Sequence, residues 1–295
     1  MYLAHFGLSE PPFGITPDTS FFFACADYQQ ALNTLLIAAR NGEGFIKITG
    51  EVGTGKTLLC RQFLANINQG SDINQQRFVT AYIPNPYLEP RTLLLALADE
   101  LGVVLRKDAD QHQLLKSLTL ALLDFAQQNK QVILCLDEAQ AMPLESLEAI
   151  RLLTNLETEK HKLLQIVLFG QPELNLRLQH DSIRQLNQRI TFHYHLSPLS
   201  RNDMDYYLSH RLTVAQGNNV AKVSGSRLFS RPAVKLLHAT SGGIPRLVNI
   251  LAHKALMLTY GEGRQQVDAR HVRAAAKDTE AANHGLWCCW LAMLQ

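Results

Sequence analysis

One stretch constrains the fold of this chain more than any other: GEVGTGKT at residues 50–57. It fits the pattern G-x-x-x-x-G-K-[ST], and it lies between a short apolar, β-branched run (44–50) and a stretch with helical periodicity (56–68). Glycines allow the backbone N–H groups of such a loop to curl around an anion, and the following helix N-terminus adds a favourable field. The stretch therefore predicts a phosphate-binding loop between a strand and a helix.

The loop predicts a site for a nucleotide and Mg²⁺. Lys56 is expected to reach the β- and γ-phosphates, and the Thr57 hydroxyl is expected to bind the metal ion. The nucleotide-binding residues predicted from the motif are Gly50, Glu51, Val52, Gly53, Thr54, Gly55, Lys56, Thr57 and Leu58.

Strand-like and helical stretches alternate along the first two thirds of the chain. Further strands are expected at 77–83, 131–138, 163–170 and 189–196, and helices at 27–40, 90–102, 111–128, 144–157 and 173–179. This alternation is typical of an α/β fold with a parallel sheet and helices on both faces. From there on only helices are expected, at 201–216, 231–240, 245–260 and 268–281. We therefore predict an αβα domain at 1–198 with a lead-in segment at 1–26, an all-helical domain at 199–282 and an apolar tail at 283–295.

A second motif ends the predicted strand 131–138. The run VILCLDE places Asp137 and Glu138 directly after an apolar segment of the kind that parallel sheets bury on both faces. Beside a phosphate loop this is a Walker B pattern, in which Asp137 would hold Mg²⁺ through water and Glu138 would orient and deprotonate the attacking water. Gln171 follows the next strand, so we expect it to face the γ-phosphate, because ligands bind outside the carboxyl ends of parallel strands. A turn residue before Pro172 is the alternative.

Three arginines complete the candidate catalytic set. Arg184 and Arg189 precede the last predicted strand, and arginine suits the stabilisation of a transferring phosphoryl group, often from another subunit. Arg246 lies in SGGIPRLVN (241–249), where two glycines and a proline predict a helix start. A cation there opposes the helix macrodipole, and nearby nucleotide phosphates would account for it. Solvated surface positions are the alternative for all three.

Composition excludes several classes of protein. Lys and Arg total 28 and Asp and Glu 26, so the chain lacks the basic excess of a non-specific DNA-coating protein, although a local basic patch stays open. The five cysteines are an odd number and form no CxxC pair, which indicates reduced thiols. No signal peptide is evident, and no run reaches the roughly 20 apolar residues of a membrane span. We expect a cytoplasmic protein.

The apolar stretch GLWCCWLAMLQ at 285–295 stays open to two interpretations. Trp287 and Trp290 suit a membrane surface, which would give the protein a peripheral contact with the inner membrane. The alternative is a tail that packs against the helical domain or a partner.

The motifs GEVGTGKT, LCLDEAQ, VLFGQPEL, IRQLNQRI and SGGIPRLVN, with the opening MYLAHFGLSEPPFGITPD, resemble AAA+ ATPases of the ExeA/GspA type over about residues 1–282. The resemblance implies a P-loop AAA+ αβα domain with a C-terminal helical lid, ATP and Mg²⁺ as ligands, and homo-oligomeric rings with ATP between subunits. Gln171 would be sensor 1, Arg246 sensor 2 and Arg189 the arginine finger, with Arg184 as second choice.

In length the chain is most similar to the members of that family associated with MSHA-type type IV pilus biogenesis. Relatives continue into a membrane span and a peptidoglycan-binding domain, so direct cell-wall binding is not expected here. The leading hypothesis is an ATPase acting with pilus or secretion assembly proteins at the inner membrane. A DNA-linked AAA+ regulator of the transposition-helper type is the alternative, and the near-balanced charge counts against nucleic acid without excluding it. The third hypothesis is a nucleotide-binding scaffold that does not hydrolyse ATP, and the presence of Lys56 and Glu138 counts against it.

Overall fold

The computed structural model describes residues 2–69, 77–104, 110–154, 162–217 and 227–282. The chain divides into two compact units. The sheet unit comprises residues 26–50 and 56–196, and the helical unit comprises 1–25, 51–55 and 197 onward. Five residues of the glycine-rich loop thus group with the helical unit, although the strand before them and the helix after them belong to the sheet unit.

The sheet unit is built on a five-stranded sheet, and all pairings among its described residues are parallel. Its strands are β1 (Phe45–Gly50), β2 (Arg77–Ile83), β3 (Lys130–Leu136), β4 (Leu164–Gly170) and β5 (Ile190–Leu196). All seven residues of β4 are buried, as expected for a strand covered on both faces. The predicted α/β fold class is confirmed.

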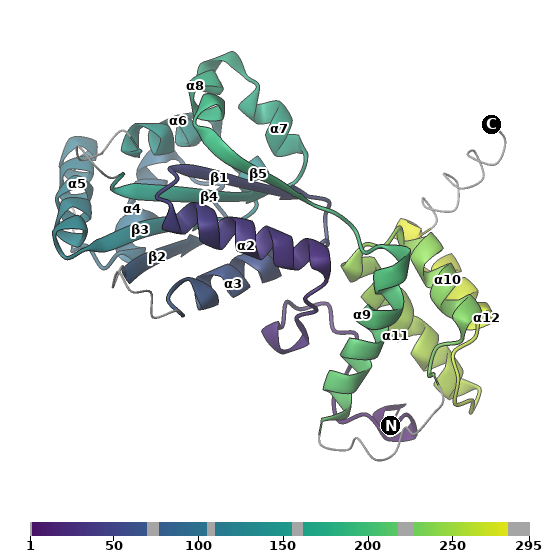
Figure 1. The fold of residues 1–295 in the computed structure, drawn as a ribbon. Coiled ribbons are helices and arrows are strands. Elements are labelled where there is room, and N and C mark those ends of the chain that lie inside the picture. The colour runs from purple at the N-terminus through teal and green to yellow at the C-terminus, as the bar shows by residue number, and fades with distance from the viewer. Residues whose placement is uncertain (1, 70–76, 105–109, 155–161, 218–226, 283–295) are drawn as a thin grey trace. The chain divides into compact units, whose positions relative to one another are not determined.

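Helices cover both faces of this sheet, as Figure 1 shows. On one face lie α2 (Ala26–Arg40) and α3 (Lys56–Ile67), and on the other lie α4 (Pro90–Glu100), α5 (Gln111–Gln127) and α6 (Leu144–Leu153). The short helices α7 (Glu173–Leu178) and α8 (Arg184–Gln188) connect β4 to β5, and α8 was not predicted. Alternate residues of β3, such as Leu134 and Leu136, pack in one apolar core with α4 and α5. Burial of these faces is the main source of the unit's stability.

The strand order is β2-β3-β4-β1-β5. Strand β4 therefore lies between β3 and β1, although 27 or more residues separate it from either in the chain. In a parallel sheet the carboxyl ends of neighbouring strands meet at one edge. The segments that follow β1, β3 and β4 are thereby brought together.

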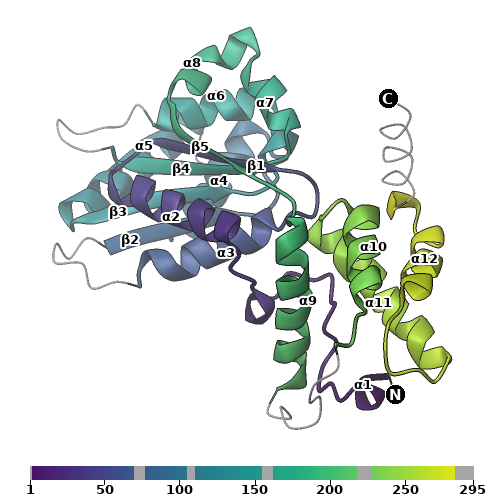
Figure 2. The same ribbon diagram turned by 45° about the vertical axis from the view of Figure 1, so that its right-hand side comes forward.

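The helical unit contains α9 (Arg201–Gln216), α10 (Arg231–Ser241), α11 (Pro245–Gly261) and α12 (Ala269–Lys277), with the short helix α1 (Tyr2–His5). Helices α10, α11 and α12 pack against one another, and α9 packs against α10 (Figure 2). Among the described residues, no helix is long and apolar enough to cross a membrane. The predicted tail at 283–295 and the predicted continuation of α6 to residue 157 lie outside the described residues.

The lead-in segment is anchored to the helical unit by Arg211 of α9. This buried guanidinium donates to the carbonyl of Pro12 and to that of Gly14, and it lies 4.7 Å from the centre of the Phe21 ring. Asn249 of α11 donates a second hydrogen bond, of 3.2 Å, to the Gly14 carbonyl. Pro12 is buried, and a buried carbonyl needs a donor, which Arg211 supplies. Residues 1–25 thus group with the helical unit, whereas the division made from the sequence attached 1–26 to the αβα domain.

Candidate functional site

The glycine-rich loop links β1 to α3. Gly53 and Gly55 have φ values of +82° and +97°, a region that glycine adopts freely and other residues rarely do. Thr54 closes the turn, since its hydroxyl donates to the Glu51 carbonyl at 2.9 Å. Helix α3 begins at Lys56, so the loop leads directly into the positive end of a helix.

The remaining predicted nucleotide-binding residues lie at the end of β1, in the loop and in the first turn of α3. Gly50 is the buried last residue of β1, Glu51 and Val52 are exposed at the start of the loop, and Leu58 is half-buried in the first turn of α3. The Lys56 side chain is buried, and its Nζ donates to the Gly50 carbonyl at 2.9 Å. Its ammonium group is thus held next to the loop backbone.

Asp137 lies directly beyond the end of β3, next to the start of α3. The Thr57 hydroxyl donates to Asp137 Oδ2 at 2.6 Å, and the Tyr82 hydroxyl of β2 lies 3.4 Å from the same oxygen. Burial raises the pKa of the Asp137 carboxyl, while the hydrogen bond from Thr57 acts in the opposite direction. Tyr82 was not predicted as a site residue, because its approach to Asp137 depends on the pairing of β2 with β3.

These oxygens fit Mg²⁺. A hydroxyl and a carboxylate within 2.6 Å are the hard oxygen ligands that this ion takes, with water and phosphate oxygens completing the octahedron. In the described parts of the chain no three or more His, Cys, Asp or Glu side chains form a cluster that could hold a metal. The donor set thus suits an ion shared with a nucleotide, and Thr57 and Asp137 are the residues that would hold it.

The Glu138 carboxylate accepts hydrogen bonds from two side-chain amides. Its Oε2 accepts hydrogen bonds from Gln140 Nε2 at 2.6 Å and from Gln171 Nε2 at 3.2 Å. The two amides are joined as well, because the Gln171 backbone N–H donates to Gln140 Oε1 at 3.0 Å. The structure therefore brings Gln171 to Glu138 as the strand order requires. Gln140 was not predicted as a site residue. The feature that could have indicated it is its position in the motif LCLDEAQ, two residues after Glu138.

Arg246 lies in the first turn of α11, which begins at Pro245 as expected. Its backbone N–H donates to the Gly53 carbonyl at 3.1 Å, and a Cβ on Gly53 would lie 2.7 Å from the Arg246 Cβ. The absence of a side chain at Gly53 lets the helix start approach the loop. The Arg246 guanidinium is exposed and makes no hydrogen bond or ion pair with any described residue.

The other two arginines, Arg184 and Arg189, precede β5 in the chain. Arg189 immediately precedes β5, whose first residue pairs with Phe45 at the start of β1. Since a strand rises about 3.3 Å per residue, Arg189 lies roughly 20 Å from Gly50, the residue at the other end of β1. Its guanidinium is 3.3 Å from the Thr154 hydroxyl at the end of α6. Arg184 is exposed at the start of α8 and makes no hydrogen bond or ion pair with the described residues.

Comparison with known proteins gives two kinds of match. A family described as AAA domain matches residues 39–178. General secretion pathway protein A of Aeromonas hydrophila is 40% identical over 288 residues, which cover 97% of this chain. The chain spans 50% of the length of that relative.

Solved structures share the fold at low identity. The Aeropyrum pernix ORC1 protein, solved in complex with DNA, is 17% identical with a TM-score of 0.65, over 92% of this chain and 70% of that one. The Aeropyrum pernix ORC2 protein, in ADPNP-ADP complexes, is 18% identical with a TM-score of 0.61, over 90% and 72%. The Thermotoga maritima RuvB Holliday junction branch migration motor is 13% identical with a TM-score of 0.56, over 90% and 73%.

Proposed function

Because the chain belongs to the AAA+ ATPases of the ExeA/GspA type, we propose that it hydrolyses ATP to ADP and phosphate with Mg²⁺. We also propose that it couples this turnover to the assembly of a type IV pilus of the MSHA type or of a related secretion machinery. The observation that supports hydrolysis best is the set of contacts at one sheet edge. Thr57 contacts Asp137, and Glu138 contacts Gln171, all beside a glycine-rich loop with a buried lysine.

Each residue of this set has a role in the proposal. The loop N–H groups bind the phosphates, and Lys56 exchanges the Gly50 carbonyl for phosphate oxygens. Thr57 and Asp137 would hold Mg²⁺, which would neutralise charge on the phosphates. Glu138 accepts a proton from the attacking water as that water bonds to the γ-phosphorus and the bond to ADP breaks. Gln171 and Gln140 fix the direction of the Glu138 carboxylate.

We further propose that the ATPase works as a homo-oligomer in which Arg189 serves the site of a neighbouring subunit. The support is its position about one strand length from Gly50, so that Arg189 lies at the end of β1 opposite to the one that leads into the loop. Arg184, five residues earlier in the chain at the start of α8, is the second choice. We also propose that Arg246 is the nucleotide-sensing arginine of the helical unit, because its backbone N–H donates a hydrogen bond to the Gly53 carbonyl of the loop.

The coupling to an envelope machinery rests on the relative named for general secretion, of which this chain spans half. We place the protein in the cytoplasm, acting on assembly proteins at the inner membrane, and leave the contact of 285–295 with lipid as a prediction. No contact in the described residues specifically favours the DNA-linked alternative.

Two variants test the proposed chemistry. Lys56→Ala should weaken ATP binding by roughly two orders of magnitude, because a charge-assisted contact to phosphate is lost. Glu138→Gln should bind ATP normally and lower turnover about 10²–10⁴-fold, because the proton acceptor is lost. Fluorescent-nucleotide titration and phosphate release measure the two effects. Glu145→Gln, an exposed residue of α6, is the matched control.

A genetic experiment tests the coupling. In a deletion strain, the wild-type chain and the Glu145→Gln control should restore surface pili counted by electron microscopy, and Glu138→Gln should not. Full piliation with Glu138→Gln would contradict coupling to ATP turnover, whatever the purified protein hydrolyses.

A further inference from the structure

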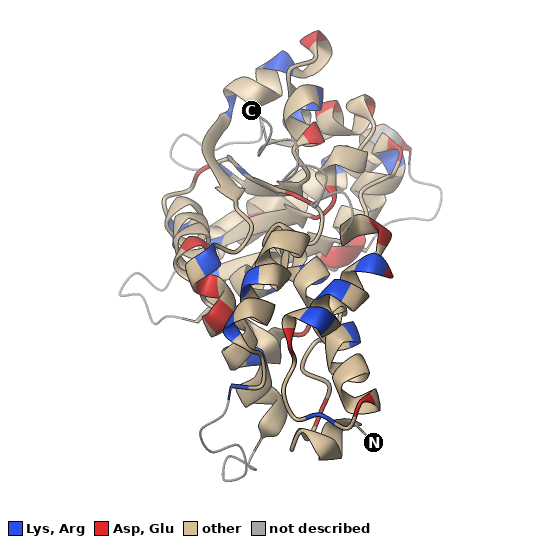
Figure 3. Cartoon of the chain, turned by 90° about the vertical axis from the view of Figure 1, so that its right-hand side faces the viewer, with Lys and Arg blue, Asp and Glu red and all other residues tan. Residues whose placement is uncertain are grey.

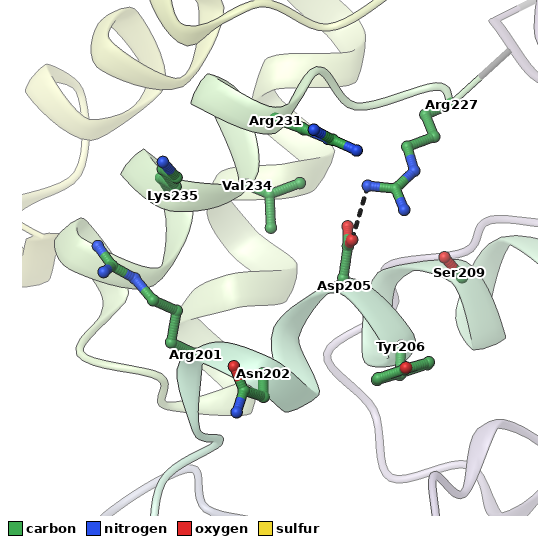
Figure 4. Close-up of a pocket in the computed structure, with 9 residues that line it drawn as sticks. All are labelled: Arg201, Asn202, Asp205, Tyr206, Ser209, Arg227, Arg231, Val234 and Lys235. Atoms are coloured by element: carbon green, nitrogen blue, oxygen red, sulfur yellow. Dashed lines mark hydrogen bonds and ion pairs between the residues drawn. The ribbon is translucent and has the colours of Figure 1, made fainter.

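A groove of about 490 Å³ lies between α9 and α10 of the helical unit. Figure 4 shows the side chains that line it, among them Arg201, Asp205 and Tyr206 of α9 and Arg231 and Lys235 of α10. Its volume is that of a ligand site. No residue of the candidate nucleotide site lines it.

The sequence places these side chains on one face of each helix. Arg201 and Asp205 are four residues apart, as are Arg231 and Lys235, and residues at this spacing lie one above the other on a helix. The buried residues of α9, such as Met204 and Tyr207, lie on a different face from these lining residues. Apart from the buried Val234, the lining is thus drawn mostly from exposed positions of two helices that pack together.

The groove has more basic side chains than acidic ones to neutralise them. Arg227 pairs with Asp205 at 2.8 Å. Arg201, Arg231 and Lys235 make no hydrogen bond or ion pair with any described residue. Arg201 and Arg231 are moreover the first residues of α9 and α10, where a cation opposes the helix macrodipole. Three unneutralised cations and two positive helix ends thus surround one cavity.

We propose that this groove binds an acidic peptide segment of a partner protein. Carboxylates of the segment pair with Arg201, Arg231 and Lys235. An apolar side chain of the segment lies against the ring of Tyr206, which is 69% exposed, and against Val234 at the groove wall.

The lining favours a peptide over a nucleic acid. Asp205 interrupts the basic lining, and its carboxylate can accept a hydrogen bond from a peptide N–H, a donor that the phosphate backbone of a nucleic acid lacks. Proteins that bind nucleic acid by its backbone present a continuous basic track. Figure 3 instead shows acidic and basic residues interspersed over the helices of this unit.

The proposal goes beyond the proposed ATPase function and does not depend on it. The Lys56→Ala variant should bind the peptide as well as the wild-type chain does. Failure of peptide binding and failure of ATP turnover are therefore separate results.

Fluorescence anisotropy of a short fluorescein-labelled peptide of alternating Glu and Leu tests the proposal. The double variant Arg231→Glu, Lys235→Glu should bind it at least about tenfold more weakly than the wild-type chain, and binding to wild type should weaken with added salt. Folding of this variant is expected to persist, since an acid at the first position of α10 favours the helix macrodipole. Arg231→Gln with Lys235→Gln gives a milder second variant, expected to bind with intermediate affinity.

The matched control is Arg273→Glu with Lys277→Glu, the same charge change at the same spacing on exposed positions of α12. It should bind the peptide within about twofold of wild type. Equal loss in both double variants would overturn the proposal, because it would mean that only net charge matters. Tighter binding of an oligothymidylate than of the peptide, with loss in the groove variant, would overturn it in favour of nucleic acid. Equal affinity for a peptide with Gln in place of Glu would also overturn it.

Discussion

At the scale of single residues, two acidic residues of the site are in unfavourable states: Glu138 in its backbone conformation and Asp137 in its burial. Glu138 has a φ of +53°, in the left-handed region where a residue with a side chain is strained by about 1–3 kcal/mol. Asp137 is almost fully buried next to it. Hydrogen bonds from Thr57, Gln140 and Gln171 hold the two carboxylates, and such strain usually persists where the surrounding structure maintains it at a functional site.

The buried carboxylate leads to a prediction on stability. Because burial raises the pKa of Asp137, the folded chain binds this proton more tightly than the unfolded chain, and the ionised carboxylate destabilises the fold at neutral pH. Asp137→Asn should therefore raise the Tm of the nucleotide-free, metal-free protein by roughly 1–3 °C at neutral pH. The gain should shrink as the pH falls through the raised pKa, since Asp137 is then neutral too. A lower Tm at neutral pH would contradict this.

Gln140 yields a prediction of another kind, because it touches Glu138 rather than the nucleotide in our proposal. Gln140→Ala should lower kcat about tenfold and leave ATP affinity within about twofold, since one hydrogen bond to a charged group is lost. Phosphate release and nucleotide titration measure the two quantities. Gln140→Asn, which keeps a shorter amide, should recover part of the rate if positioning is the role.

At the scale of elements, the segment 241–246 is shaped by its backbone contacts. Gly243 has a φ of +75°, its carbonyl accepts from the Leu199 N–H at 2.8 Å, and a Cβ there would lie 2.3 Å from the Leu199 carbonyl oxygen. Gly242 ends α10 with a φ of +58°, and a Cβ on it would meet nothing within 4 Å. Only one of the two adjacent glycines is therefore needed for space.

This difference predicts unequal stabilities for two similar variants. Gly242→Ala should lower the free energy of unfolding by about 1 kcal/mol, the cost of a left-handed alanine. Gly243→Ala should lower it by more than about 3 kcal/mol, because the Leu199 backbone must also move. Denaturant unfolding measures both, and equal losses would argue against the close approach of the segments around Leu199 and Gly243.

At the scale of the whole molecule, the parallel sheet separates two sets of candidate catalytic residues. The loop and the acids follow the strands at their carboxyl ends, whereas Arg189 precedes β5 and lies beside the start of β1. Our proposal that Arg189 acts as an arginine finger therefore calls for a second copy of the chain.

Mixing of inactive variants tests that arrangement. Arg189→Ala and Lys56→Ala should each be inactive alone and should recover part of the ATPase activity when mixed, because an intact loop then meets an intact arginine. Arg184→Ala in place of Arg189→Ala identifies which arginine acts. Absence of recovery at every mixing ratio for both arginines would argue against a finger supplied by a neighbour.

Local features of the sequence determined most of the elements. All five strands and the long helices lie within a few residues of their expected limits, because hydrophobic periodicity, glycine and proline act over short distances in the chain. The loop and the two acids were evident for the same reason. The short helices α1 and α8 were missed, since four or five residues carry too little periodicity to predict.

Only the tertiary structure decided how these elements meet. The order β2-β3-β4-β1-β5 brings Gln171 to Glu138, and the pairing of β2 with β3 brings Tyr82 to Asp137. The burial of Arg211 against Pro12 likewise assigns the lead-in to the helical unit. Such contacts join residues far apart in the chain, and they form because whole apolar faces pack together. A single sequence states which faces are apolar, but the partner of each face is selected by the packing of the complete fold.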